Sequence, residues 1–293
     1  MLFAIKLVII ISTFFIISQI LMLYREQKSS YGKMNSKILT ALSGFIANFA
    51  DTIGLGSFAI LVATNKNERL CDEKKLPGTL NSQAMLPVMV QSLFFLKFVA
   101  MDFTTLISLI SATAIGGLIG GSIVVKLNKQ TIRKIMSIGF LLMGILILCQ
   151  QLHLFPIGGD AVTLRSYKLG MAIVAMILVG MLPAVGIGTY APSQLVLFFL
   201  GMSPLIAFPI MTTASAFVHL TAGYTFIKQK QVAVRETILL SIPGALGVLV
   251  AAPILMYVNA GLIHWLLLAV VLYNSAFIWL SYKKTQKSQG ISK

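Results

Sequence analysis

The stretch at residues 48–57, NFADTIGLGS, places an acid, two glycines and several hydroxyl or amide side chains inside a long apolar run. The run covers residues 38–64, which exceeds the ~20 residues that a helix needs to cross a bilayer. Gly54 and Gly56 weaken a continuous helix near its middle, because glycine has high conformational freedom. The stretch therefore predicts a membrane-embedded helix that is broken halfway.

The composition predicts an integral protein of the cell membrane surrounded by the lipid bilayer. Hydrophobic residues make up 57% of the 293 residues, charged residues make up 11%, and the mean hydropathy is +0.91; soluble domains rarely reach these values. The net charge of +15 lies in short clusters between apolar runs. This pattern is typical of cytoplasmic loops, so we expect no nucleic-acid partner.

Cys71 and Cys149 are far apart in the sequence, and neither has metal-type spacing around it. Neither a disulfide framework nor a thiolate metal site is indicated, and we expect no cofactor.

The N-terminus contains an apolar segment at residues 3–23, about one bilayer crossing long, followed by Arg25 and Lys28. A signal peptide is the alternative interpretation. Signal peptides have a positive first region, a shorter apolar region and a small-residue cleavage site, whereas Lys6 is the single early charge here and bulky residues close the segment. The sequence favours an uncleaved anchor helix.

Further apolar runs follow, and one of them is also interrupted. They cover residues 84–101, 104–125, 135–152, 169–200, 205–227, 237–258 and 261–282. The run at 169–200 is interrupted by Pro183, Gly186 and Gly188, and a shift of 132 residues places Gly54 and Gly56 on the last two. A broken segment followed by three uninterrupted spans thus occurs twice, and such pairing is the best sequence-level indication of a transporter's binding site.

This repetition divides the chain into five parts. They are an N-terminal transmembrane anchor with a basic loop (1–36), repeat 1 (37–151), an inter-repeat loop (152–167), repeat 2 (168–283) and a basic C-terminal tail (284–293). If each broken segment is a re-entrant hairpin, the basic residues left outside the cell are Lys6, Lys97, Arg165 and Lys168. Fully spanning segments give a much weaker positive-inside bias.

The sequence therefore predicts an all-α polytopic membrane protein with a cytoplasmic C-terminus. An anchor helix precedes two homologous, inverted repeats, each with one broken, re-entrant hairpin and three transmembrane helices. Inversion makes the hairpins enter from opposite faces and meet near the midplane, where transporters of this type bind substrate.

The two broken segments predict an anion site. Half-helices that begin near Gly56 and Gly188 would direct unpaired N–H groups and positive dipole ends at a cavity. We expect substrate to be bound by the glycines and polar residues of the breaks and of the spans that follow: Asn48, Thr52, Gly54, Gly56, Ser57, Thr79, Asn81, Gly186, Gly188, Thr189, Tyr190, Thr212 and Ser215. The alternatives are that the glycines serve close helix packing and that the hydroxyls bond to their own helix backbone.

Asp51 is the one acid deep within an apolar run, and His219 is a histidine within another. Either residue can couple transport to a proton or cation, because ionisable groups in spans are costly and often functional. Asp51 can instead cap the second half-helix with help from Thr52. For His219, a helix-to-helix hydrogen bond is the structural alternative.

Several strings resemble the TauE/SafE family of sulfite and organosulfonate exporters. They are NFADTIGLGSFA, LPGTLNSQAMLPVMVQSL, GIGTYAPSQLVLFFLGMSPLIAFPIM and IPGALGVLVAAPIL, and the likeness covers nearly the whole chain after Lys37. The resemblance implies an inner-membrane carrier whose partner is a small sulfur-containing anion. The family's motif often has a richer glycine run than Gly54-Leu-Gly56, so the substrate within that class stays open, as does a homo-oligomeric state.

Other classes of function fit less well, and we expect no enzymatic activity. An intramembrane aspartyl protease needs a second deep acid, and a zinc protease needs a pattern such as H-E-x-x-H, whereas His153, His219 and His264 are scattered. Gly54-Leu-Gly56 lacks the third glycine of a nucleotide-binding fingerprint. An anion channel, or a carrier for a different small organic anion, is the remaining alternative.

Overall fold

The computed structural model describes residues 2–26, 37–53, 56–68, 70–96, 102–154 and 158–254, together with single residues and short groups between 265 and 283. The regular structure of these residues is helical, apart from an isolated bridge between Ala161 and Met202. Gly54 and most of the predicted last span at 261–282 lie outside the described residues.

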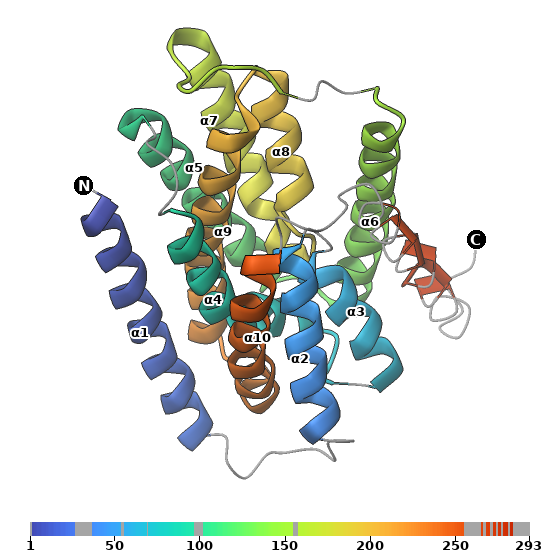
Figure 1. Cartoon of the computed structure of the whole chain (residues 1–293). Coiled ribbons are helices and arrows are strands. Elements are labelled where there is room, and N and C mark those ends of the chain that lie inside the picture. Colours follow the sequence, from blue (N-terminus) through green and yellow to red (C-terminus); the bar gives the residue numbers. More distant parts are fainter. Residues whose placement is uncertain are drawn as a thin grey trace.

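The helices follow one another along the chain and form a bundle (Figure 1). They are α1 (Leu2–Glu26), α2 (Lys37–Thr52), α3 (Ser57–Glu68), α4 (Leu76–Phe95), α5 (Phe103–Val124), α6 (Lys129–Gln151), α7 (Ser166–Met181), the 3-10 turn η1 (Leu182–Val185), α8 (Tyr190–Phe199), α9 (Pro204–Lys228) and α10 (Val234–Ile254).

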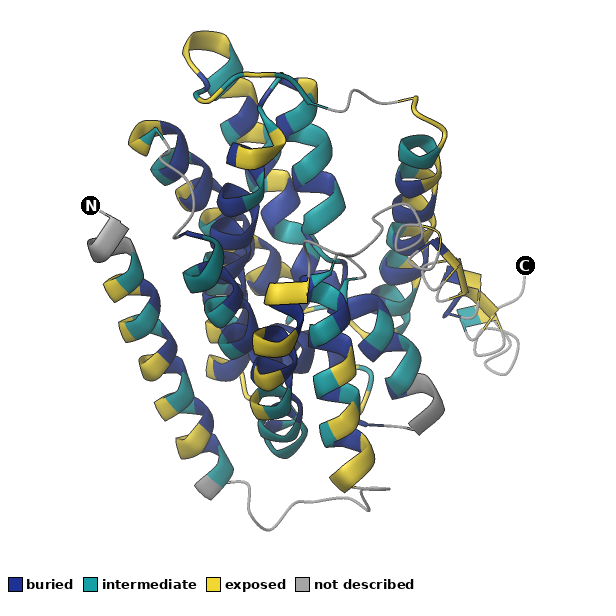
Figure 2. Ribbon diagram, viewed as in Figure 1, coloured by how far each residue is buried: buried dark blue, intermediate teal, exposed yellow. Residues whose placement is uncertain are grey.

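Within the described residues, six helical segments are long and apolar enough to cross a membrane. They are Lys6–Tyr24, Phe103–Val124, Lys129–Gln151, Ser166–Val185, Pro204–Lys228 and Val234–Ile254. Large apolar side chains such as Phe14 of α1 and Val174 and Leu178 of α7 are exposed. Figure 2 shows exposed residues along the outer face of α1. The chain is therefore a multi-pass membrane protein with an apolar outer surface suited to lipid.

Helix α9 forms the centre of the bundle and is buried along most of its length. It lies antiparallel to α4, because Ser92 near the end of α4 donates to Thr213 near the start of α9, while Gly78 at the start of α4 packs on Phe226 near the end of α9. Helix α5 packs on the opposite flank, where the space above Gly117 is filled by Val218. Small residues allow this close approach.

Helices α2, α4 and α10 run parallel and begin at the same end of the molecule. Gly44 and Asn48 of α2 pack on Leu240 and Gly244 of α10, and the Thr79 hydroxyl of α4 accepts a hydrogen bond of 3.0 Å from the N–H of Ala233, just before α10. We call this end, which includes the loops at 70–75, 125–128 and 229–233, the basic end. It lies at the bottom of Figure 1.

The first broken segment both begins and ends at the basic end. The chain leaves the helix between Thr52 and Ser57, at the break that the sequence predicts. Helix α2 runs inward from the basic end, and α3 must return there because α4 starts at the basic end only eight residues after α3 finishes.

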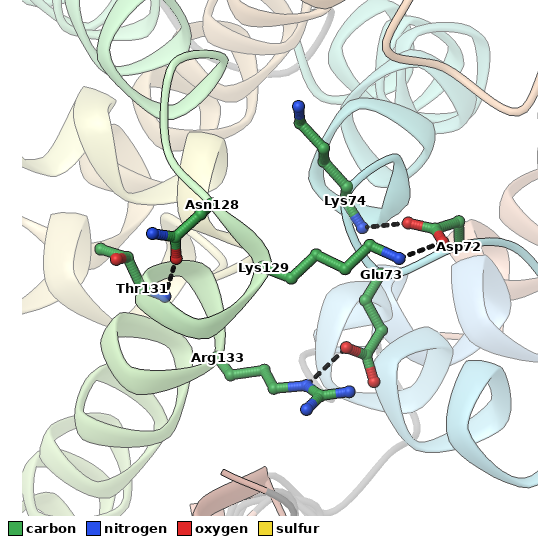
Figure 3. Close-up of polar contacts among 7 residues, drawn as sticks. All are labelled: Asp72, Glu73, Lys74, Asn128, Lys129, Thr131 and Arg133. Carbon is green, nitrogen blue, oxygen red and sulfur yellow. Dashed lines mark hydrogen bonds and ion pairs between the residues drawn. The ribbon is translucent and has the colours of Figure 1, made fainter. Parts of the chain in front are cut away.

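Two ion pairs hold the loop between α3 and α4 against the start of α6 (Figure 3). Lys129 pairs with Asp72, and Arg133 Nε lies 2.5 Å from Glu73 Oε2. Partial burial raises the pKa of Asp72, but the hydrogen bonds from Lys129 and from the Lys74 N–H outweigh it and hold the net pKa below its usual value. The contact fixes the exit of the first broken segment relative to α6.

The second broken segment begins and ends at the opposite end. The loop before α7 pairs with the loop after α8 through Gly159 N–H to Met202 O (3.2 Å) and Ser203 N–H to Ala161 O (2.9 Å). Lys168 Nζ also donates to Leu200 O over 3.2 Å. Helix α7 therefore runs inward from this end, and the short helix α8 returns to it.

Helix α4 begins eight residues before the apolar run at 84–101 that the sequence suggests, and this is a correction. Pro77 stands in its first turn, and the polar residues Asn81, Ser82 and Gln83 that follow are buried against neighbouring helices. Because these side chains face protein and not lipid, the first half of α4 is helical without being apolar.

Helix α6 contacts helical residues close to the C-terminus. Ser137 Oγ donates to the Ser275 carbonyl over 2.8 Å, and Ser275 Oγ donates to the Ser137 carbonyl over 2.9 Å. The reciprocal pair joins the last helices of the two predicted repeats.

Candidate functional site

The second broken segment turns at Gly186. The N–H of Gly186 donates to Pro183 O over 2.9 Å, and the N–H of Ile187 donates to Leu182 O over 3.2 Å, which closes the 3-10 turn. Gly186 has φ +82, and a Cβ there would lie 2.8 Å from the Met136 methyl. Only glycine takes this left-handed conformation without strain.

The N-terminus of α8 is open. Its first backbone hydrogen bond runs from Ser193 N–H to Thr189 O, and the N–H groups of Gly188, Thr189, Tyr190 and Ala191 have no hydrogen-bond partner among the described residues. Apart from the two neighbours of Gly188 in the chain, no described residue has an atom within 4 Å of the position that a Cβ would take there. The helix therefore presents unpaired donors next to a space that no described side chain fills.

Four buried polar side chains form a continuous chain beside this opening, which we call the relay. Thr189 Oγ1 lies 3.2 Å from Ser215 Oγ, Ser215 Oγ lies 3.4 Å from His219 Nε2, and His219 Nδ1 lies 3.1 Å from Asn81 Oδ1. Thr189 belongs to the second hairpin, Ser215 and His219 to α9, and Asn81 to α4. The relay brings together four of the residues that the sequence singles out.

The Asn81 amide also holds the other side of the hairpin tip. Its Nδ2 donates to Pro183 O over 2.7 Å and to Pro77 O over 2.8 Å. The relay therefore contacts the chain both before and after the turn at Gly186. In this way α4 and α9 clasp the second tip.

The first break has a different arrangement, because a side chain already occupies the N-terminus of α3. Asp51 Oδ1 accepts the N–H of Ser57 over 2.6 Å, across Gly56 at φ +67. This is the capping geometry that we expected as one of two roles for Asp51. Thr52 does not assist, since its hydroxyl donates to Asn48 O in its own helix.

The two breaks approach each other around His219 and Tyr190. The ring of Phe58, the second residue of α3, lies 5.2 Å from the imidazole of His219. The buried Tyr190 hydroxyl has no hydrogen-bond partner among the described residues. Tyr190 also packs edge-to-face on Phe208 of α9 at 5.6 Å.

Other predicted site residues lie elsewhere or make local bonds. Thr79 joins α4 to the start of α10 at the basic end. Thr212 donates to Pro209 O of its own helix. Asn48 donates to Gly44 O and to Gln83 Oε1, so it belongs to the contact between α2 and α4. These three residues are held by helix packing in the described structure.

Sequence reasoning missed the Pro183 carbonyl, Phe58 and Gln83. A carbonyl leaves no mark on a sequence, and Phe58 is one apolar residue among many. Gln83 had a signal, since it is an amide in the middle of a membrane helix. Its Nε2 and the Asn48 Oδ1 are buried without a partner among the described residues.

Among the residues that the structure describes, no group of three or more His, Cys, Asp or Glu side chains could hold a metal ion. No protein-family model, curated protein or solved structure matches the chain. The function is therefore argued from the geometry of the site.

Proposed function

We propose that the protein is a carrier that moves small sulfur-containing anions, such as sulfite or organosulfonates, across the cell membrane. The observation that carries the proposal is the open N-terminus of α8, with four unpaired N–H groups beside free space at Gly188. Backbone N–H groups at a helix start are well suited to an oxyanion, because they donate hydrogen bonds and carry the positive end of the helix dipole. No buried lysine or arginine is needed.

The arrangement of the two hairpins supports an inverted repeat. One hairpin starts and ends at the basic end, and the other starts and ends at the opposite end. Hairpins that enter from opposite faces are typical of carriers that expose one central site alternately to each side. By the positive-inside rule the basic end is cytoplasmic.

The two helix starts have unequal roles in this proposal. Asp51 satisfies Ser57 at the start of α3, and in its ionised form it disfavours a second anion at short range. The start of α8 has no such charge. We therefore place the substrate at Gly188 and the hydroxyl of Thr189, with the Tyr190 hydroxyl as a further donor.

The sulfur class and the outward direction rest on the resemblance to the TauE/SafE exporters. The geometry itself supports a small oxyanion of any acid. A carrier is favoured over a channel because the relay holds the second tip on both sides of its turn, at Thr189 and at the Pro183 carbonyl. The tip must therefore be released before an anion can pass. The same features support transport, and not catalysis, as the activity.

Uptake of labelled sulfite and of methanesulfonate into proteoliposomes tests the proposal. Gly188→Ala places a methyl group in the free space without a clash, so the variant folds but loses transport by about tenfold or more, as expected when charge-assisted hydrogen bonds are displaced. Gly170→Ala is the matched control, since a Cβ at Gly170 of α7 also meets no atom within 4 Å but lies far along the chain from the tip.

Equal rates of transport in Gly188→Ala and Gly170→Ala would refute the anion site at the start of α8. A unitary conductance in planar bilayers would replace the carrier by a channel. Uptake of cations or neutral solutes, with none of anions, would refute the substrate class.

A further inference from the structure

The hydrogen bonds between His219 and Thr189 can run in either of two directions. The Asn81 amide determines which nitrogen of His219 controls that direction. Asn81 Nδ2 contacts two carbonyl oxygens, Pro77 O and Pro183 O, and carbonyls only accept hydrogen bonds. The amide nitrogen must therefore face them, and Oδ1 must face His219. His219 Nδ1 consequently carries a hydrogen and donates to Asn81, which leaves Nε2 as the ring atom whose protonation can change.

With Nε2 unprotonated, the hydrogens run from the hairpin tip toward the imidazole. Ser215 donates to His219 Nε2, and Thr189 donates to Ser215. The Thr189 hydroxyl then has only lone pairs to offer to a ligand. Its oxygen, next to Gly188, repels an anion in this state.

With Nε2 protonated, the two hydrogen bonds between His219 and Thr189 reverse, while Nδ1 still donates to Asn81. His219 donates to Ser215, and Ser215 donates to Thr189, so the hydrogen of the Thr189 hydroxyl becomes free. The hydroxyl changes from an acceptor to a donor beside the unpaired N–H groups of α8. Protonation of one ring nitrogen thus prepares the anion site two residues away in the relay.

We infer that His219 takes up a proton from water together with the anion, and that the relay transmits this protonation to Thr189. This inference rests on the proposed anion carrier and adds its coupling ion. A lone imidazolium inside the bundle would be costly, but the bound anion supplies the opposite charge. For a monovalent anion, the loaded site is neutral overall.

The helices around His219 provide few other charges. Helices α4 and α5 carry none within their bounds. The remaining titratable groups of the packed elements are Lys6, Tyr24, Arg25 and Glu26 of α1, Lys37 and Asp51 of α2, Lys66 and Glu68 of α3, Tyr190 of α8, Tyr224 and Lys228 of α9, and Arg235 and Glu236 of α10. Of these, Asp51 and Tyr190 stand at the tips, and Asp51 is the competing proton acceptor.

Calorimetric binding of methanesulfonate to the purified full-length protein, between about pH 5 and 8, tests the inference. This probe stays ionised over that range, so its own titration does not contribute. We expect the affinity to rise as the pH falls, by at most about tenfold per pH unit, which is the limit for one linked proton. Titrations in buffers of different ionisation enthalpy should show one proton taken up per anion.

Two variants separate the imidazole from the relay. His219→Gln keeps an amide that can bond to Asn81 but cannot take up a proton, so its affinity should not vary with pH. Ser215→Ala keeps the imidazole and interrupts the relay, so the gain in affinity at low pH should shrink several-fold. Ser92→Ala is the matched control, because it removes another buried hydroxyl pair between α4 and α9, that with Thr213, and should retain the full gain.

The outcomes distinguish the coupling from the carrier function. Binding that is tight but independent of pH overturns the inference and leaves the carrier. A pH dependence that survives in His219→Gln overturns it in favour of Asp51. A full gain in Ser215→Ala overturns the role of the relay. No binding of any anion at any pH overturns the carrier and the inference together.

Discussion

At the scale of single residues, Asn81 is the side chain on which the site depends most. It is fully buried, and its amide bonds to the Pro183 carbonyl of the second hairpin, to His219 of α9 and to Pro77 of its own helix. One residue of α4 thus sets the position of the tip and the orientation of the imidazole. Without it, no partner would fix the hydrogen on His219 Nδ1.

Asn81→Leu keeps the approximate volume and removes the amide. His219 Nδ1 then stays buried without a partner and the Pro183 carbonyl keeps only the Gly186 N–H, so we expect the free energy of unfolding to fall by about 2 kcal/mol and transport to be lost. Thermal unfolding in detergent measures the loss. Gln91→Leu on the same helix is the matched control, since Gln91 Nε2 already lacks a partner among the described residues; equal losses in the two variants would contradict the clasp.

At the scale of elements, the loop between α3 and α4 couples the first hairpin to α6. Asp72 and Glu73 of this loop pair with Lys129 and Arg133 in the first turns of α6. Asn128 caps the same helix by accepting the N–H of Thr131 over 2.8 Å, so the partners of the loop stand on a well-defined helix start (Figure 3). The pairs fix the two elements at the basic end.

Charge reversal tests this coupling. Glu73→Arg should lower the melting temperature slightly, because partly exposed pairs contribute at most about 1 kcal/mol, and the double variant Glu73→Arg/Arg133→Glu should recover it. The recovery should weaken in high salt. Two single variants whose effects simply add would show that the pair makes no contribution.

The Asp72 carboxylate gives this contact a pH dependence. Its pKa is held below the usual value of 3.8, so its stabilising effect is complete above that pH and is lost as the pH falls through the lower folded-state pKa. Asp72→Asn should therefore lower the melting temperature at neutral pH and have a smaller effect in strong acid. A constant difference across this range would contradict the ion pair.

The breaks were predictable from the sequence, whereas the relay was not. Gly56 and Gly186 mark the turns because their φ values are positive, and a requirement for glycine is visible in a sequence. The start of α4 could not be predicted from hydropathy, because its first half carries polar residues that face other helices. Asn81 and His219 are separated by 138 positions, and nothing local in a sequence indicates that two such residues meet.

At the scale of the whole molecule, two hairpins open toward opposite ends and meet near the centre. Helices α2, α4 and α10 begin at the basic end, whereas α7 and α9 begin at the other end. The basic loops gather at one end, which gives the bundle a direction in the membrane. A carrier needs this arrangement so that each hairpin can gate one side.

Cysteine labelling tests this orientation. In a background without Cys71 and Cys149, Asp160→Cys should react with a membrane-impermeant maleimide in intact cells, and Lys74→Cys should react only after permeabilisation. Both residues are exposed, so access depends on the side of the membrane. Labelling of both positions from the same side would contradict opposed hairpins.

The central claim is that a small oxyanion binds at the open start of α8. The most direct measurement is thermal unfolding of the purified protein at constant ionic strength with sulfite, sulfate, thiosulfate, sulfoacetate or acetate, compared with Gly188→Ala and Gly170→Ala. A ligand that binds only the folded state raises the melting temperature with its concentration. We predict selective stabilisation by a sulfur oxyanion, retained in Gly170→Ala and lost in Gly188→Ala. An equal response to every anion would contradict the sulfur class, and a response that survives in Gly188→Ala would contradict the site.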